Sequence, residues 1–204
     1  MIPPGFFRIG EIVRIHRLHT DRALAPGEPT GLDGRAAHYL GRVLRVAPGH
    51  HVVLFNGDGH DYACTVERVR KDAVELEVRS RLPAKPESPL RITVVQAVSR
   101  GERMDQALQK CTELGAAAFQ PAWSERVEVR LKGEKLERRL QHWRGVVIAA
   151  CEQCGRRRIP ALARPARLPD WLHERPQSQP GVLLHHRAET LAALAPADVP
   201  CRVE

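Results

Sequence analysis

The chain has 204 residues, 43% of them hydrophobic, with a formal net charge of +8 and a pI near 9.8. That length suits one large domain or two small ones, and no run approaches the roughly 18 apolar residues of a membrane span. No signal peptide opens the chain, so a cytosolic protein is expected. Almost all basic residues are Arg, whose planar side chain grips phosphate and stacks on bases. This favours nucleic-acid binding, with a GC-rich codon bias as the alternative.

Residues 1–11 are interpreted as a leader or start-site extension of no clear role. From Ile12 to about Arg81 the pattern is mostly that of strands, apart from a short helix predicted over residues 35–46. The sequence Asn-Gly-Asp-Gly at 56–59 is a strong hairpin signal, and apolar residues alternate with polar ones on the two strands that follow it. Three short antiparallel strands after a small helix predict a small β-barrel.

Three prolines fall between Ser80 and Pro89, which marks the best domain boundary. The hydrophobic pattern also changes there, from a period of two residues to a period of 3.6 residues. We therefore predict two domains, residues 1–82 and residues 90–204.

The second domain opens with an apolar strand predicted over residues 92–98, a basic turn at 99–101 and a helix that reaches residue 114. Ligands of α/β sheets gather beyond the carboxyl ends of the strands, where residues 99–103 would lie. An ordinary solvated helix is the alternative. The apolar stripe at helical spacing consists of Met104, Ala107, Leu108, Cys111 and Leu114.

Strands and helices continue to alternate in the rest of the chain, which predicts an α/β domain with a mostly parallel sheet. The pattern past Val199 is typical of the approach to another strand, so the sequence is expected to be truncated within this domain. The predicted elements are a strand at 115–121, a long amphipathic helix at 136–150, a short helix near 169–174, a buried strand at 181–185 and a last helical turn at 189–194.

The chain has five cysteines, an odd number that argues against a disulfide framework in the absence of a secretion signal. Cys151 and Cys154 have the spacing of half a zinc site, but no second pair follows at a suitable distance. Cys151 also ends an apolar helical stripe, so a core position is favoured over zinc binding or redox chemistry.

Three segments place Arg beside a carboxylate just after predicted strands or helices: residues 99–103, 124–126 and 152–156. A carboxylate can hold an Arg side chain ready for a phosphate or a base. The alternative is three surface ion pairs, each worth roughly 0 to 1 kcal/mol.

Five stretches, in matching order, carry a resemblance to a known family. They are H-Y-L-G-R-V-L-R-V-A-P-G (38–49), Q-A-V-S-R-G-E-R-M-D (96–105), Q-K-C-T-E-L-G (109–115), S-E-R (124–126) and A-A-C-E-Q-C-G-R-R-R-I-P (149–160). From about residue 12 to its end, the chain resembles the RsmE family of 16S ribosomal RNA uridine N3-methyltransferases.

The resemblance implies a PUA-like β-barrel followed by a SPOUT-type α/β domain with a deep trefoil knot, an exception to the rule against knots. It also implies S-adenosylmethionine as cofactor, 16S ribosomal RNA or the small ribosomal subunit as substrate, and a homodimer away from membranes. The family's Gly-Pro-Glu-Gly-Gly loop and its later Leu-Arg-rich loop form most of the knot and cofactor pocket and would follow Glu204. This length of chain is therefore expected to bind the cofactor weakly and to dimerise poorly.

Methyl transfer to uridine N3 needs a base or stabilisation of the uridine anion, because that nitrogen is protonated at neutral pH. An Arg could stabilise the anion, while a Glu could orient that Arg or take the proton. The expected catalytic residues are Glu125, Arg126, Glu152 and Arg156; the expected cofactor-binding residues are Leu184 and His185; no metal is expected. The expected RNA-binding residues are Arg14, Arg42, Arg45, Arg100, Arg103 and Lys110.

Two other hypotheses stay open. A non-catalytic RNA-binding module would use the same Arg residues without transferring a methyl group. A metal-binding protein would be built on Cys151 and Cys154.

Overall fold

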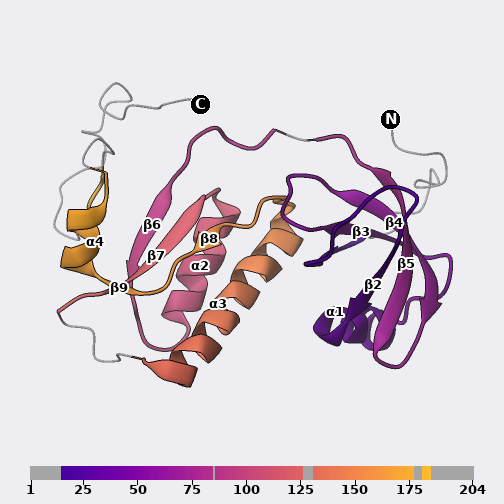
Figure 1. Ribbon diagram of the computed structural model, residues 1–204, viewed down its shortest axis with the longest axis horizontal. Helices are drawn as coiled ribbons and strands as arrows, with labels where there is room; N and C mark the ends of the chain where they lie inside the picture. Colours follow the sequence, from indigo (N-terminus) through magenta and orange to yellow (C-terminus); the bar gives the residue numbers. More distant parts are fainter. Residues whose placement is uncertain (1–14, 85, 126–130, 177–180, 185–204) are drawn as a thin grey trace.

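The computed structural model describes residues 15–84, 86–125, 131–176 and 181–184. Two sheets, each with its own helices and its own hydrophobic core, lie side by side (Figure 1). The chain arches from the last strand of the first sheet to the first strand of the second, and the C-terminal end of the longest helix points back toward the first sheet.

The first sheet has five strands in the order β1-β3-β4-β5-β2, with β1 parallel to β3 and all other pairs antiparallel. On β5 buried residues alternate with partly exposed ones, as predicted for a barrel wall. The predicted hairpin joins β3 to β4, and both Gly57 and Gly59 in it have positive φ. The strands are β1 (His16–His19), β2 (Pro29–Asp33), β3 (His51–Phe55), β4 (Tyr62–Val69) and β5 (Ala73–Arg81).

The helix predicted over residues 35–46 is shorter than expected. It forms as α1 (Gly34–His38) and continues as a π-helical turn, η1 (Tyr39–Val43), after which Arg45 takes a φ of 51°. Leu40 and Val46 are both buried in the core of the first sheet. A regular helix turns 100° per residue and would place two residues six apart about 120° from each other. Val46 lies past the end of η1, after the left-handed turn at Arg45, so the chain leaves the helix before this residue enters the core.

The second sheet is parallel throughout, which confirms the predicted α/β layer. Its central strand is β7 (Ala118–Trp123), which pairs with β6 (Thr93–Ala97) and with two short strands, β8 (Ala161–Leu162) and β9 (Ala166–Arg167). The two short strands were not predicted, because two residues are too few to show a period.

Three helices accompany this sheet: α2 (Arg103–Glu113), α3 (Gly133–Cys154) and α4 (Leu168–Glu174). Met104 and Leu108 of α2 pack with Trp143 of α3 in the second core, as the apolar stripe predicted for α2. The stripe is wrong for Leu114, which is 85% exposed because α2 ends at Glu113. The long helix is confirmed and runs farther at both ends than predicted.

The prediction of a buried strand at 181–185 is wrong for residues 181–184, which the structure describes. Residues 181–184 lie in no strand, and Val182, Leu183 and Leu184 are between 54% and 85% exposed. An apolar run becomes a buried strand only where neighbouring strands complete its hydrogen bonds, and none of the described residues pairs with it. The helical turn at 189–194 and the strand approach at 199 lie outside the described residues. Within the described ranges, no helix is both long and apolar enough to span a membrane.

Candidate functional site

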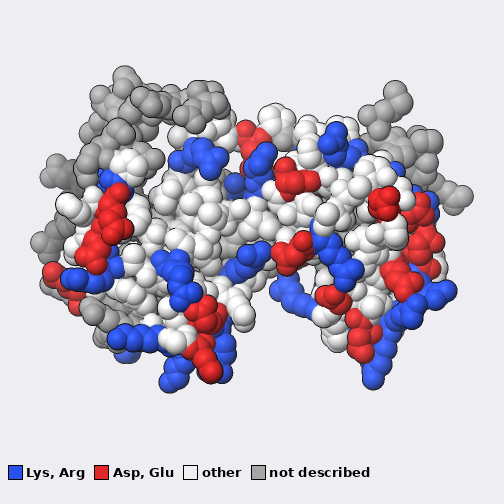
Figure 2. Space-filling view, viewed as in Figure 1, with Lys and Arg blue, Asp and Glu red and all other residues white. Residues whose placement is uncertain are grey.

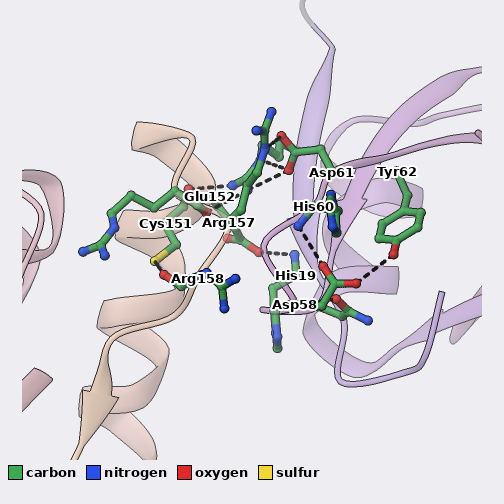
Figure 3. Close-up of polar contacts among 12 residues, drawn as sticks. His19, Asp58, His60, Asp61, Tyr62, Cys151, Glu152, Arg157 and Arg158 are labelled. Carbon is green, nitrogen blue, oxygen red and sulfur yellow. Dashed lines mark hydrogen bonds and ion pairs between the residues drawn. The ribbon is translucent and has the colours of Figure 1, made fainter. Parts of the chain in front are cut away.

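Asp61 lies at the centre of the contact between the two sheets. Its Oδ1 accepts a hydrogen bond from Arg17 Nε of β1 at 2.9 Å, and its Oδ2 accepts one from Arg157 Nε, just after α3, at 2.7 Å (Figure 3). The three side chains are between 7% and 13% exposed. One buried carboxylate therefore binds an Arg from each half of the molecule.

Arg17 also binds the chain at the C-terminal end of α3. Its Nη1 donates to the carbonyl oxygen of Cys151 at 2.6 Å and its Nη2 to that of Arg156 at 2.7 Å, while its guanidinium lies 3.7 Å from the centre of the Phe55 ring. The last carbonyl groups of a helix lack partners within the helix and carry partial negative charge. Arg17 of the first sheet adds a hydrogen bond and a positive charge at the Cys151 carbonyl, which also accepts the N–H of Gly155, so the other half helps to stabilise the end of α3.

Glu152 and Arg156 do not form the pair that the sequence suggested. Glu152 Oε1 accepts a hydrogen bond from the backbone N–H of His19 at 3.0 Å, and its Oε2 lies 3.3 Å from Arg35 Nη2. Gly155, with a φ of 82°, ends α3 between Glu152 and Arg156 and turns the chain, so the two side chains leave in different directions.

Arg156 binds backbone and linker instead. Its Nη1 donates to the carbonyl oxygens of Thr112 and Ala116, and its Nη2 lies 3.4 Å from Glu87 Oε2 in the segment between the sheets. Glu87 Oε1 also accepts the backbone N–H groups of Arg157 and Arg158. Glu152, Arg156 and Glu87 thus extend the contact around Asp61.

The carboxyl ends of β6 and β7 meet at one edge of the second sheet. Ala97 pairs with Ala122, and the N–H of Val98 donates to the carbonyl oxygen of Ala122 at 3.0 Å. The segments that begin at Ser99 and Ser124 therefore leave the sheet side by side. The Ser99 hydroxyl is buried and has no hydrogen-bond partner among the described residues.

The structure brings some of the expected site residues to this edge. Glu125 is exposed one residue past Ser124, and Arg103 is exposed at the first turn of α2; Arg126 lies outside the described residues, as do Arg14 and His185. Arg42 and Arg45 are exposed on the first sheet, on and just after η1, and Arg100 lies in the turn after β6. Lys110 binds Glu113 on its own helix at 2.9 Å.

Leu184, which was expected to bind S-adenosylmethionine, is 76% exposed within an exposed segment. A cavity of about 440 Å³ between the β3–β4 connection and α3 is lined by Asn56, Leu140 and Ala161, among others. Ala161 pairs with Ala118 at the start of β7, the opposite end from Ser124, so this cavity lies away from the edge where ligands of α/β sheets bind.

Burial governs the chemistry of Cys151. It raises the pKa of this thiol to about 12, and the pKa of Cys64 to about 12 as well. A buried thiol with a raised pKa is a poor nucleophile, and Cys151 is fully buried, so it fills a core position. Across the part of the chain that is described, no three His, Cys, Asp or Glu side chains gather as metal ligands would.

Two family matches cover the two halves of the chain. Residues 32–79 match an RNA methyltransferase PUA domain, and residues 86–199 match an RNA methyltransferase domain. Ribosomal RNA small subunit methyltransferase E of Aquifex aeolicus is 31% identical over 169 residues, which are 82% of this chain and 68% of that protein. The chain belongs to the ribosomal RNA small subunit methyltransferase E family, RsmE.

Two solved structures are similar to this chain. The RsmE protein of Neisseria gonorrhoeae, crystallised with S-adenosylmethionine, has a TM-score of 0.76 and 37% identity, over 80% of this chain and 67% of that one. A putative methyltransferase of Legionella pneumophila with bound cofactor has a TM-score of 0.77 and 39% identity, with the same coverage. The expected fold, a PUA-like barrel followed by a SPOUT-type domain, is confirmed; the knot falls outside the described residues. The chain spans 64% of the length of the RsmE protein of Buchnera aphidicola from Schizaphis graminum, 28% identical over 158 residues.

Sequence reasoning missed the residues that join the two halves of this RsmE chain. Asp61, Arg17 and Glu87 stand alone in their segments and carry no periodic signal. Arg157 belongs to the stretch 149–160, which carried the family resemblance and gave this residue no role of its own. Only the fold shows that its side chain is 93% buried against Asp61.

Proposed function

We propose that this chain forms the RNA-binding and catalytic part of an S-adenosylmethionine-dependent methyltransferase that methylates N3 of a uridine in 16S ribosomal RNA. The cofactor supplies the methyl group, and the described residues of this chain supply contacts to RNA rather than the cofactor pocket. Membership of the RsmE family supports the reaction class. The names of the relatives support the small ribosomal subunit as the source of the substrate.

One observation carries the proposal: two polar, Arg-containing segments leave the parallel sheet together, at the carboxyl ends of β6 and β7. Ligands bind at this edge in α/β sheets, because the loops there are free to vary while the strands hold them in place. The partnerless buried hydroxyl of Ser99 supports a ligand at the same edge, since a buried polar group without a partner is costly.

The chemistry is assigned to the segment after β7. Arg126 stabilises the negative charge that develops on the uracil ring as N3 loses its proton, and Glu125 orients Arg126 or takes the proton. Glu152 and Arg156 are assigned to positioning, because each contact they make is to the linker, to the first sheet or to backbone carbonyl groups.

The RNA contacts are assigned to exposed basic residues of both halves. Arg42 and Arg45 are assigned to RNA contacts on the barrel. Arg100 and Arg103 are assigned to RNA contacts at the edge of the second sheet. Lys110 and Arg14 remain candidates in the same role. The proposal includes a homodimer as the active unit, which analytical ultracentrifugation of the protein at its natural length would test.

The test is methylation of small ribosomal subunits by the protein at its natural length, read as N3-methyluridine by mass spectrometry. The unaltered protein is expected to form it, and Arg126→Ala is expected to lower kcat at least tenfold, since it removes the charge that stabilises the anion. Arg70→Ala is the matched control: Arg70 is an exposed Arg bound to Glu75, 2.7 Å away, at the far turn of the barrel. RNA binding without any methylation would favour the binding-module hypothesis instead.

We also propose that the chain folds as two domains, residues 1–82 and 90–204. The exposure of residues 86–91 supports a linker, although Glu87 is held by the segment after α3. Limited proteolysis of the folded protein is expected to cut first within residues 83–89, on either side of Glu87. A first cut between residues 100 and 150 would contradict the division.

A further inference from the structure

The first half of α3 carries a group of basic side chains on one side. Lys135, Arg138, Arg139 and His142 recur at steps of three, one and three residues, which places them along one face of the helix. Together with Leu131 they line a shallow hollow of about 330 Å³. Figure 2 shows Lys and Arg side chains gathered at the lower end of the second half of the molecule, where α3 begins, with some carboxylates beside them.

Among the described residues, no carboxylate lines this hollow. Within the described part of the chain, Lys135, Arg138 and Arg139 form no ion pair. The nearby Glu137 is engaged elsewhere, because both of its oxygens bind Arg164. Other Arg residues around this helix do have acidic partners: Arg144 binds Asp21, and Arg156 binds Glu87. Lys135, Arg138 and Arg139 therefore differ from these two Arg residues, because they have no acidic partner among the described residues.

The arrangement of Lys135, Arg138 and Arg139 lowers the stability of α3. Like charges three or four residues apart on a helix repel, which applies to Lys135 with Arg138 and with Arg139. Lys135 also lies in the first turn of α3, where the helix dipole disfavours a cation. Glu134, in the first turn and four residues before Arg138, offsets part of this repulsion but forms no ion pair among the described residues. An anion bound in the hollow would supply the remaining compensation.

The chemistry of the hollow fits phosphate groups. An Arg guanidinium matches two phosphate oxygens at once, and a Lys ammonium adds a point charge that can follow a curved backbone. His142 is held at the edge by Asp105 of α2, whose Oδ2 lies 2.7 Å from its Nε2. Leu131, on the other side, lies six residues after Glu125 in the chain. The hollow thus adjoins in sequence the segment assigned to catalysis.

We propose that Lys135, Arg138 and Arg139 form a phosphate-binding patch that grips the RNA backbone beside the methyl-transfer segment. The proposal rests on the proposed function, because it takes RNA as the substrate. It adds a third anchoring point to those on the barrel and at the ends of β6 and β7. Contacts of this kind position a nucleic acid without reading its sequence.

The test compares the salt dependence of binding to a 16S ribosomal RNA fragment. Lys135→Gln, Arg138→Gln and Arg139→Gln, made together, remove three charges and keep good helix formers. Each lost phosphate contact should lower the slope of log K against log salt by about 0.7 to 0.9, so the slope falls by about 2. Affinity near 0.1 M salt should fall by at least about tenfold.

Two controls separate charge from structure. Arg164→Gln removes an exposed Arg that is already bound to Glu137, so its slope should stay unchanged. The conservative set Lys135→Arg, Arg138→Lys and Arg139→Lys should keep the slope of the unaltered protein. If the triple Gln variant kept that slope, or if the conservative set lost it, the patch would be overturned while the proposed function stood. If the unaltered protein bound RNA with no salt dependence, the proposed function would fail first, and the patch with it.

Discussion

Replacing Asp61 by Ala is expected to lower the free energy of unfolding by about 3 to 5 kcal/mol. The substitution leaves Arg17 and Arg157 buried without their shared carboxylate, and a buried charge that loses its partner is strongly destabilising. The same change removes the Asp61–Arg157 contact between the halves while the bonds of Arg17 and Glu152 remain, so proteolysis between residues 82 and 92 should become faster. Urea unfolding of the purified protein measures the first effect, and a timed digest measures the second.

Asp21→Ala is the matched control for Asp61. Asp21 also joins the two halves, through Arg144 at 3.0 Å, but its side chain is 79% exposed and that of Arg144 60% exposed. Exposed ion pairs contribute at most about 1 kcal/mol, so this variant should unfold close to the unaltered protein. An equal loss in both variants would mean that burial of the Asp61 pairs adds nothing, and the account of the contact would be wrong.

Replacing Trp143 by Ala is expected to lower the free energy of unfolding by about 3 to 5 kcal/mol as well. Trp143 is 1% exposed and packs with Leu108 and Phe119 in the core of the second sheet, so its removal leaves a large cavity between α2, α3 and β7. Denaturant unfolding, followed by circular dichroism at a helix wavelength, measures the loss.

Two comparisons test the cause of that loss. Trp143→Phe keeps most of the volume and removes an indole N–H that has no partner among the described residues, so it should cost at most about 2 kcal/mol. Leu114→Ala should change stability by less than about 0.5 kcal/mol, because Leu114 is 85% exposed. A large effect at Leu114 would indicate that this surface is covered in solution, by a partner or a second copy.

Helix α3 takes part in the RNA contact, the second core and the contact between the halves, through three different parts of its length. Its first half carries the proposed phosphate patch, and Trp143 in its middle packs in the core. Near its C-terminal end, the carbonyl oxygen of Cys151 accepts a hydrogen bond from Arg17. The helix thus carries the proposed patch at one end and contacts the barrel at the other.

Most of the longer elements and the family could be predicted from the sequence alone, whereas the short strands β8 and β9 could not. The period of two residues on β5 and the Asn-Gly-Asp-Gly turn specified the barrel strands, since local spacing decides which face a side chain takes. The stripe of Met104 and Leu108 specified α2 in the same way. The five motifs between residues 38 and 160 carried the family, because they depend on residue identity and order and not on contacts.

Only the tertiary structure decided which charged residues hold the molecule together. Arg17 and Asp61 lie 44 residues apart, and Asp61 and Arg157 lie 96 apart, so no local pattern could pair them. Glu152 and Arg156, four residues apart, were expected to pair with each other, yet the turn at Gly155 sends each to a different partner. Local periodicity determines an element and its buried face, whereas ion pairs form between whatever charges the packed elements bring together.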